Sequence, residues 1–479
     1  MRVVIHWFRR DLRLVDNLAL HYASEHCDQF VPVYVLSTWK DYHHWTGPKR
    51  QSFLCDSLES LSGNLQHEGV SLIIRSGQAD QVLLQLARET EACLVTTVRD
   101  PDPFGRAMEE RVQKTLATLS VDFKALNDTV IHPADEVLTG SQTPYRVFTP
   151  YARAWRNQPK PSPLGKVKLS GKAYSSPVPS EPLPTLKYWD IQPDGEHVAG
   201  GERAARERLK TFLSGAVLEY ADQRNTPSRE ITSRLSQDLR FGLLSPRETW
   251  KRAQEIENSH EISIAERKNV QVFITELIWR EFYQAILAHY PEVLVHEFNP
   301  KHRNLRWKSA ASHPETFQRW CEGRTGFPFV DAGMRQLVAT GFMHNRLRMV
   351  TAMFLTKDLQ IYWKDGEAFF HRHLVDADIA SNNGGWQWSA GTGADAAPYF
   401  RIQNPWTQGQ RFDADGDYIR KWIPELKDVK ASELHQAPKN GRPLAKDYPL
   451  PMVDHAEERA NCLAMFAGSS PPRGETSGA

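Results

Sequence analysis

Residues 376–405, DADIASNNGGWQWSAGTGADAAPYFRIQNP, combine side chains that hydrogen-bond with side chains that are flat and apolar. Paired carboxylates, amides and indoles occur there: Asp376, Asp378, Asn382, Asn383, Trp386 and Trp388. Gly384 and Gly385 allow a close backbone approach, so we expect a break here rather than a plain amphipathic helix. Carboxylates and amides can address polar edges, while indoles cover a ring face. The segment therefore predicts a site for a large planar heterocycle.

A second group of polar aromatic residues lies in VQVFITELIWREFYQAIL, residues 270–287. The apolar residues recur at helical spacing, which predicts a helix with one buried face. Glu276, Trp279, Arg280 and Tyr283 follow at i, i+3, i+4 and i+7, so they share another face. A platform of this kind suits a flat polar ligand. The plain alternative is a solvated face with a Glu276–Arg280 ion pair.

The segment GFMHNRLRMV, residues 341–350, repeats this arrangement on a second predicted helix. Asn345, Arg348 and Met349 share one face by spacing, and Arg346 points toward another partner. An amide can hydrogen-bond a base-like edge, and Met349 can pack against it. An ordinary helix surface with arginines is an equally simple interpretation.

Two further segments carry groups suited to phosphate. KHRNLRWK, residues 301–308, places four cations around Trp307, a pattern typical of nucleic-acid contacts or of a solvated surface. In YADQRNTPSREITSRLS, residues 220–236, we expect hydroxyls to precede helical segments, at Thr226 and at Thr232 and Ser233. Such positions cap helices, and they also bind anions.

Composition narrows the classes of function. The net charge is +1, which argues against bulk electrostatic coating of nucleic acid but permits a local basic groove. The five cysteines lack metal spacing and predict reduced thiols in a cytoplasmic protein. The sequence contains no membrane-length apolar run and no secretory signal, and nothing in it demands more than a monomer. We expect no metal site.

Short apolar strands alternate with helical patterns along the first 130 residues or so. Strands are predicted at 3–8, 31–36, 71–76 and 92–98, which indicates a parallel α/β sheet. Neither dinucleotide nor P-loop glycines follow the first strand. We expect an α/β domain at 1–132, a proline-rich extended connector at 133–200, an all-helical domain at 201–465 and a disordered tail at 466–479.

These motifs together resemble the photolyase/cryptochrome family, and within it the class I cyclobutane pyrimidine dimer photolyases. The similarity covers residues 1–455 and rests on WFRRDLRLVDNLAL, TSRLS, ELIWREFY, MHNRLRM, the 376–405 segment and FDADGDYIRKWIPEL. It implies a Rossmann-like antenna domain, a long connector and a C-terminal all-helical domain that holds a U-shaped FAD. The implied activity is light-driven repair of damaged DNA by reduced, anionic FAD.

The resemblance also implies roles for individual residues. It implies FAD-binding residues at Tyr220, Thr232, Ser233, Leu235, Ser236, Arg280, Arg348, Asp376, Asp378 and Asn382. Among these, Asn382 is implied to face the flavin N5. The lesion and its DNA strand are assigned to Arg224, Glu276, Trp279, Asn345, Arg346, Met349 and Trp388. An electron route is implied through Trp386, Trp363 and Trp307 to the surface.

Other positions depart from the family pattern. Phe273 and Phe342 stand where the closest class I members carry Trp. Residues 98–112 lack the Asn-Glu pair of the folate-binding members, and Leu294 and Val295 replace expected polar positions. Methenyltetrahydrofolate, a deazaflavin and the lack of an antenna all remain open.

Three other functions are compatible with parts of the pattern. A cryptochrome-type photoreceptor is disfavoured by Asn382, where plant-type receptors tend to carry Asp, and by the retained lesion residues. A (6-4) photolyase is disfavoured because its pocket needs a His pair, whereas residues 341–345 read GFMHN. An ordinary flavin oxidoreductase is disfavoured because the sequence contains no nicotinamide-binding motif.

Overall fold

The computed structural model describes residues 1–37, 47–195 and 197–468, which form two compact units. The first unit contains Met1–Asp222, Ile231–His289 and Val375–Asp378. The second contains Gln223–Glu230, Tyr290–Leu374 and the chain from Ile379 onward. Each unit is therefore assembled from separate stretches of the sequence.

A five-stranded parallel sheet forms the centre of the first unit. Its strands are β1 (Val3–Phe8), β2 (Gln29–Leu36), β3 (Ile73–Ser76), β4 (Leu94–Val98) and β5 (Asp122–Leu126). They lie in the order β3-β2-β1-β4-β5, and each neighbouring pair is parallel. The four predicted strands are confirmed. Sequence analysis missed β5, because none of its residues is fully buried and DFKAL lacks an apolar run.

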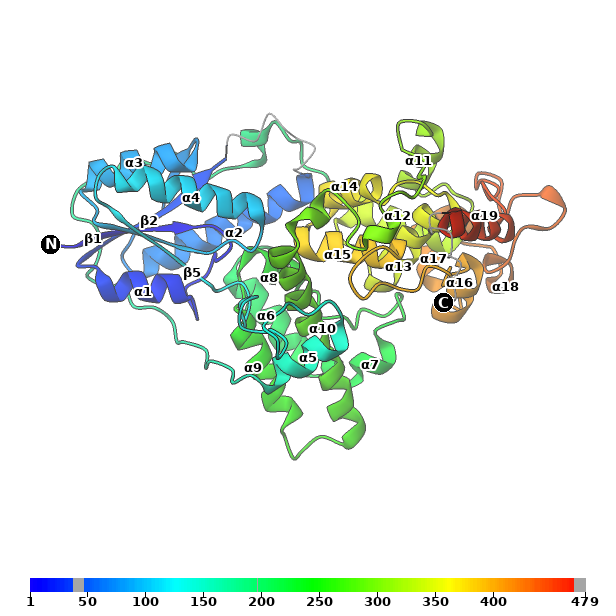
Figure 1. Cartoon of the computed structure of the whole chain (residues 1–479), viewed down its shortest axis with the longest axis horizontal. Coiled ribbons are helices and arrows are strands. Elements are labelled where there is room, and N and C mark those ends of the chain that lie inside the picture. Colours follow the sequence, from blue (N-terminus) through cyan, green and yellow to red (C-terminus); the bar gives the residue numbers. More distant parts are fainter. Residues whose placement is uncertain (38–46, 196, 469–479) are drawn as a thin grey trace, which may run out of the picture. The chain divides into compact units, whose positions relative to one another are not determined.

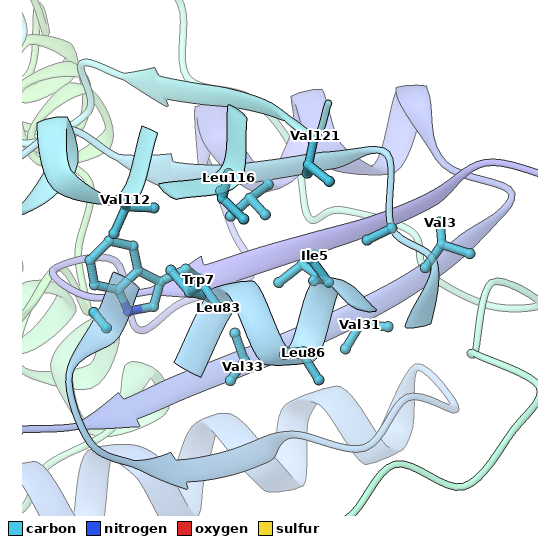
Figure 2. Close-up of a cluster of buried hydrophobic side chains, with 14 of the residues drawn as sticks. Val3, Ile5, Trp7, Val31, Val33, Leu83, Leu86, Val112, Leu116 and Val121 are labelled. Atoms are coloured by element: carbon cyan, nitrogen blue, oxygen red, sulfur yellow. The ribbon is translucent and has the colours of Figure 1, made fainter. Parts of the chain in front are cut away.

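Helices cover both faces of this sheet (Figure 1). The four that follow the first four strands are α1 (Leu18–His26), α2 (Pro48–His67), α3 (Ala79–Thr90) and α4 (Pro103–Ala117). The last two pack on one face, and α1 lies on the other (Figure 1). Figure 2 shows the core under α3 and α4, where Ile5 and Val33 of the sheet meet Leu83 and Leu116. Burying each such side chain is worth about 1.5–3 kcal/mol.

Polar residues fix where two of these helices begin. The Asn17 side chain accepts a hydrogen bond from the Leu20 N–H at 3.0 Å, which caps α1. Asp102 caps α4 in the same way through the Gly105 N–H at 2.8 Å, with Pro103 in the first turn. These caps hold the helices at the carboxyl-terminal side of β1 and β4.

The predicted connector, residues 133–200, is not extended throughout. It contains α5 (Phe148–Asn157) and a 3₁₀ turn at Leu186–Trp189. Phe148, Tyr151 and Trp155 are buried at helical spacing, and the α5 helix packs on α10 (Ile264–His289). The α5 helix was not predicted, because the prolines around it mask this apolar stripe.

The remaining helices of the first unit are α6 (Glu202–Leu213), the start of α7 (Tyr220–Gln223), α8 (Ser236–Phe241), α9 (Pro246–Glu257) and α10. A buried ion network joins the loop after β1 to the loop after β5 and to α9. Arg13 pairs with Asp128, and Arg247 pairs with both Asp16 and Asp128. Because all four side chains are buried, mutual pairing is what makes their charges tolerable there.

The second unit is built from helices joined by loops, and none of the five strands lies among its described residues. Its helices are α11 (Pro314–Cys321), α12 (Pro328–Thr340), α13 (Asn345–Met353), α14 (Trp363–His373), α15 (Ile379–Ala390), α16 (Pro405–Phe412), α17 (Asp417–Trp422), α18 (Ala431–Leu434) and α19 (His455–Gly468). A π-helical turn, Phe354–Asp358, follows α13. The α19 helix includes residues 466–468, which were assigned to a disordered tail, while 469–479 lie outside the described residues.

The helix α15 corrects another expectation. It runs without interruption through Gly384 and Gly385, where a backbone break was predicted. Its neighbours explain this outcome. Asn383 and Gln387 donate to the Val293 carbonyl oxygen at 3.1 and 3.0 Å, so tertiary hydrogen bonds offset the poor helix propensity of glycine.

Among the described residues, no helix is long and apolar enough to cross a membrane. Within the same ranges, no group of three or more His, Cys, Asp or Glu side chains could hold a metal ion. All five cysteines are described, and each is a free thiol.

Candidate functional site

The predicted site residues are divided between the two units. The first unit holds Tyr220, Thr232, Ser233, Leu235, Ser236, Glu276, Trp279, Arg280, Asp376 and Asp378. The second holds Arg224, Trp307, Asn345, Arg346, Arg348, Met349, Trp363, Asn382, Trp386 and Trp388.

The helix α10 carries the predicted polar aromatic platform. Glu276, Trp279 and Arg280 are all half-buried along it. The Trp279 indole stacks on Phe148 of α5, with ring centroids 3.6 Å apart and ring planes 6° apart. The Tyr283 ring lies 5.5 Å from that indole. Phe148 therefore fixes the plane of Trp279, a role that sequence analysis missed because Phe148 lies 131 residues earlier.

Arg280 of this platform is tied to main-chain carbonyls. Its guanidinium donates to the Thr129 oxygen at 2.7 Å and to the Leu239 oxygen at 3.4 Å. Burial lowers the pKa of Arg280, and the nearby Asp378 partly offsets that effect. Arg280 thus places a fixed positive charge on the platform.

The loop that carries Asp376 and Asp378 belongs to the first unit and is held by arginines. Both carboxylates are buried. Arg240 donates to the Ala377 oxygen at 3.1 Å, and the Arg10 guanidinium lies 3.9 Å from the Asp378 carboxylate. The paired carboxylates of the sequence motif therefore sit among fixed cations, which suits hydroxyl or ring N–H donors of a ligand.

The hydroxyls of Thr226, Thr232 and Ser233, expected to precede helices, lie in loops and turns. The helix α8 begins at Ser236 with Leu235 as its N-cap residue, and no side chain caps it. Thr232 and Ser233 lie in the preceding loop and are half-buried. The chain after Thr226 is a turn and not a helix. The expectation that these hydroxyls cap helices is wrong, because Arg234, with a positive φ of 50°, and Leu235 separate Ser233 from the start of α8.

In the second unit, α13 presents the predicted amide and arginines. Asn345 is exposed, whereas Arg348 is half-buried and donates to the Met343 oxygen at 2.8 Å. Arg346 turns to another partner, as predicted, and donates to Asn225 at 2.7 Å. The guanidinium of Arg346 lies 4.3 Å from the centre of the Phe412 ring. Burial, with the charges of Arg224 and Arg411, lowers its pKa to about 10.

His344 is a functional candidate that sequence analysis did not single out. It caps α13 by accepting the Arg346 N–H on its side chain at 3.2 Å. Burial and the neighbouring Arg346 and Arg348 lower the pKa of His344 to about 4. The imidazole is therefore neutral at physiological pH beside Asn345.

Asn382 lies on α15 with its amide oriented by α14. Its Nδ2 donates to the Glu367 carbonyl oxygen at 3.0 Å, and the neighbouring Asn383 donates to the Glu367 carboxyl at 3.0 Å. The orientation of Asn382 therefore leaves its carbonyl oxygen as the group that can accept from a ligand. Gly385 shares this face at i+3, and a Cβ there would meet nothing within 4 Å. The helix surface beside Asn382 is therefore open at Gly385.

The Trp386 indole of α15 packs closely against the neighbouring helix α14. It is 2% exposed, and a Cβ added at Gly366 of α14 would stand 2.1 Å from its ring. Phe370 and Trp320 meet it edge-on, with centroids 4.9 and 6.1 Å away. Gly366 is therefore required for this indole to reach α14, a constraint that the sequence motif does not reveal.

The other two predicted route residues lie along the same unit. Trp363 is fully buried at the start of α14, and Trp307 is half-buried. Tyr362 joins them, with its ring 5.6 Å from Trp363 and 6.3 Å from Trp307. Aromatic rings thus lead from a buried indole to a partly exposed one.

A cavity of about 220 Å³ lies in the first unit at the end of α10. Its lining includes Arg99, Arg106, His132 and Gln284. Gln284 is 4% exposed, and neither of its polar side-chain atoms has a hydrogen-bond partner among the described residues. The Nε2 atom of His132 is also buried without a partner. This cavity was not predicted from the sequence.

Known proteins match the chain over nearly its whole length. A model of the FAD binding domain of DNA photolyase matches residues 273–468, and a DNA photolyase model matches residues 4–168. A deoxyribodipyrimidine photo-lyase of Agrobacterium fabrum is 38% identical over 97% of each chain. The chain belongs to the DNA photolyase family. It therefore carries the family's FAD-binding domain, and the predicted fold class is confirmed.

Solved structures show the same relationship. A bacterial class III photolyase from Agrobacterium tumefaciens is 36% identical, covers 98% of each chain and has a TM-score of 0.88. A cryptochrome from Synechocystis is 27% identical, covers 97% of this photolyase-family chain and 99% of its own, and has a TM-score of 0.85. Because both kinds match, the comparisons show the family and not the subclass.

Proposed function

We propose that this photolyase-family chain repairs cyclobutane pyrimidine dimers in DNA under blue light. The observation that carries the proposal is the α10 platform. A flat indole, Trp279, is fixed by Phe148 beside the carboxyl group of Glu276 and the cation of Arg280. Such a platform can stack a base and hydrogen-bond its carbonyl edge.

The flavin is the source of the electron in this proposal. When it is bound in its reduced, anionic form and absorbs light, FAD would supply one electron to the lesion. Tyr220, Thr232, Ser233, Leu235, Ser236, Arg280, Arg348, Asp376, Asp378 and Asn382 would hold it. The Asn382 side chain supports this assignment because its Nδ2 is engaged by Glu367. Its carbonyl oxygen suits the N5–H donor of a reduced flavin.

The lesion residues have separate tasks. Photolyases extrude the damaged bases from the duplex at a cost of a few kcal/mol. Stacking on Trp279, about 1–3 kcal/mol per base, offsets part of that cost. Glu276 would hydrogen-bond the pyrimidine carbonyls and stabilise the charge that develops when the dimer accepts an electron. Asn345, Met349 and Trp388 would line the pocket, and Arg224 and Arg346 would contact the DNA strand.

We propose that Trp386, Trp363 and Trp307 carry electrons from the surface to a flavin that has become oxidised. The burial of the first two and the partial exposure of Trp307 support this direction. Packing alone would not require an aromatic series that ends at the surface. We expect the protein to work as a monomer on cytoplasmic DNA.

We further propose that a light-harvesting chromophore, a folate or a deazaflavin, occupies the cavity at the end of α10. Gln284 supports this because both of its buried polar atoms lack partners among the described residues. An amide offers a donor and an acceptor to a cyclic amide edge. Purified protein should then show near-ultraviolet or blue absorption beyond that of FAD. Gln284→Leu should remove that absorption and leave FAD bound.

Two substitutions on α10 test the assignment of the platform. Glu276→Ala should lower the yield of repaired dimers more than it lowers binding of dimer-containing DNA, because the carboxyl hydrogen bond that stabilises the electron-bearing dimer is lost. Trp279→Ala should weaken binding, because a stacking surface is lost. Equal loss of bound FAD in both variants would show that these residues are structural. Repair and binding assays with measured FAD content separate these outcomes.

A further inference from the structure

The three indoles of the proposed electron route differ in how their N–H groups are bonded. The Trp363 Nε1 donates to the Glu297 carboxylate at 3.2 Å. The Nε1 groups of Trp386 and Trp307 are buried and have no hydrogen-bond partner among the described residues. Within this series a carboxylate is thus bonded to the middle indole alone.

Glu297 is held in position and is removed from water. Its side chain is buried, and its carbonyl oxygen accepts a hydrogen bond from Arg303 Nε at 3.1 Å. Tyr362 and His302 are two titratable groups that sense its charge. Burial and the charges of Glu297, Glu367 and Asp365 raise the pKa of Tyr362 to about 12. Acidic side chains therefore surround Trp363, and the phenol of the adjacent Tyr362 keeps its proton.

This bonding matters because an indole that loses an electron becomes a much stronger N–H acid. A hydrogen-bonded carboxylate can then take the proton without any diffusion step. A positive charge in a buried site is also costly unless it is neutralised or paired. The cost of a buried charge applies to Trp386 as well, but of the three indoles Trp363 is the one with a carboxylate partner among the described residues, so it is the position at which electron loss and proton loss can be coupled.

We propose that Glu297 is the proton acceptor of Trp363, an assignment that rests on the proposed electron route. Light-excited oxidised FAD is the oxidant and acts through Trp386. An electron passes from Trp363 to oxidised Trp386, and the Nε1 proton of Trp363 moves to the Glu297 carboxylate. A neutral indole radical remains beside a neutral carboxylic acid. When an electron arrives through Trp307, the proton returns to Nε1, so charge and atoms balance.

The consequence is a longer separation of charge. The indole must recover its proton before or as it accepts an electron back from Trp386, so wasteful recombination is slowed. Glu297 is a positioning and proton-accepting residue, and it touches neither the lesion nor the DNA in this proposal.

Flash photolysis tests the proposal in the Trp307→Phe background, where Trp363 is the last indole of the route. The parent should form a neutral indole radical with a solvent deuterium isotope effect. Adding Glu297→Gln keeps an acceptor oxygen but removes the basic carboxylate. It should slow deprotonation by at least about 100-fold, so that the indole radical cation persists. Glu297→Asp should restore part of the fast phase.

The matched control is Asp365→Asn, which removes a nearby charge. Asp365 accepts a hydrogen bond from the Ala310 N–H at 2.8 Å, so it is not the acceptor of Trp363. This variant should deprotonate at the parental rate. Unchanged deprotonation in Glu297→Gln, with FAD content and melting temperature retained, would overturn the role of Glu297. If Trp363→Phe left light-driven FAD reduction intact, the electron route itself would be wrong.

Discussion

At the scale of single residues, Trp279 depends on a partner from a distant segment. Phe148 covers one face of its indole at a centroid distance of 3.6 Å. Stacked aromatic pairs are worth about 0.5–1.5 kcal/mol beyond the area they bury. The orientation of the proposed stacking surface is therefore set by α5 as well as by α10.

Phe148→Ala should weaken binding of dimer-containing DNA by about 2- to 10-fold, the equivalent of that aromatic pair energy. Bound FAD should be unchanged, because the ring contacts of Phe148 are with Trp279 and Phe282, neither of which is proposed to bind FAD. Phe148→Tyr, which keeps the stacked ring, is the control and should bind like the parent. Normal binding by the alanine variant would mean that Trp279 needs no support or does not stack a base. Fluorescence anisotropy with a labelled oligonucleotide measures the difference.

At the scale of elements, the contact between α14 and α15 depends on Gly366. A Cβ there would stand 2.1 Å from the Trp386 ring and 2.6 Å from Leu355. Gly366→Ala should destabilise the protein by about 1–3 kcal/mol through overpacking, and it should slow light-driven FAD reduction as Trp386 is displaced. Denaturant unfolding and bleaching of the FAD absorption measure the two effects.

Gly63→Ala serves as the control for that substitution, because the added Cβ in α2 meets nothing within 4 Å. It should be neutral or stabilising by about 0.5–1 kcal/mol. Equal behaviour of the two alanine variants would contradict the packing of Trp386 against α14.

The same pair of helices contains a carboxyl group that should make stability depend on pH. Burial raises the pKa of Glu367 to about 7 from an ordinary value of 4.5. A raised carboxyl pKa favours the folded state while the group is protonated, below about pH 4.5. That contribution is lost as the pH rises through 7. Glu367→Gln, which keeps an oxygen for Asn383, should flatten this decline.

Chemical unfolding at a series of pH values between 4.5 and 8 measures the contribution of Glu367. The parent should lose stability relative to Glu367→Gln as the pH increases. Parallel curves for the two proteins would show that Glu367 ionises freely in the folded state.

At the scale of the whole molecule, regular spacing made much of the fold predictable. Four buried strands and the α10 helix follow from apolar periodicity, which depends only on neighbouring residues. Neither the half-exposed strand β5 nor the uninterrupted helix α15 was predicted, because tertiary contacts determine whether these segments form a strand and a helix. Gln387, for example, supports α15 through the distant Val293 oxygen.

The candidate site was predictable to a similar extent. Sequence motifs drew attention to Trp279, Asn382, Trp307 and Trp386, because they lie in dense, recognisable segments. Trp363 lies outside those segments and was implied by the family resemblance alone. Phe148 and Glu297 were missed because each contacts a residue more than 60 positions away. A lone Phe or Glu carries no local signal of such a contact.

The overall charge of the molecule also bears on its function. A net charge of +1 gives no bulk attraction to DNA, so the proposed recognition of DNA would depend on local cations, for which we propose Arg224 and Arg346. The central claim is that this recognition ends in the splitting of a cyclobutane dimer rather than in signalling.

The most direct test is blue-light repair of an oligonucleotide that contains one thymine cyclobutane dimer. The purified protein is first reduced, and a strand with a (6-4) lesion is run in parallel. We predict light-dependent restoration of the cyclobutane strand, none in the dark, and an unchanged (6-4) strand. Binding of the dimer without repair under light would contradict the claim and favour a photoreceptor. Repair of the (6-4) strand alone would contradict it as well.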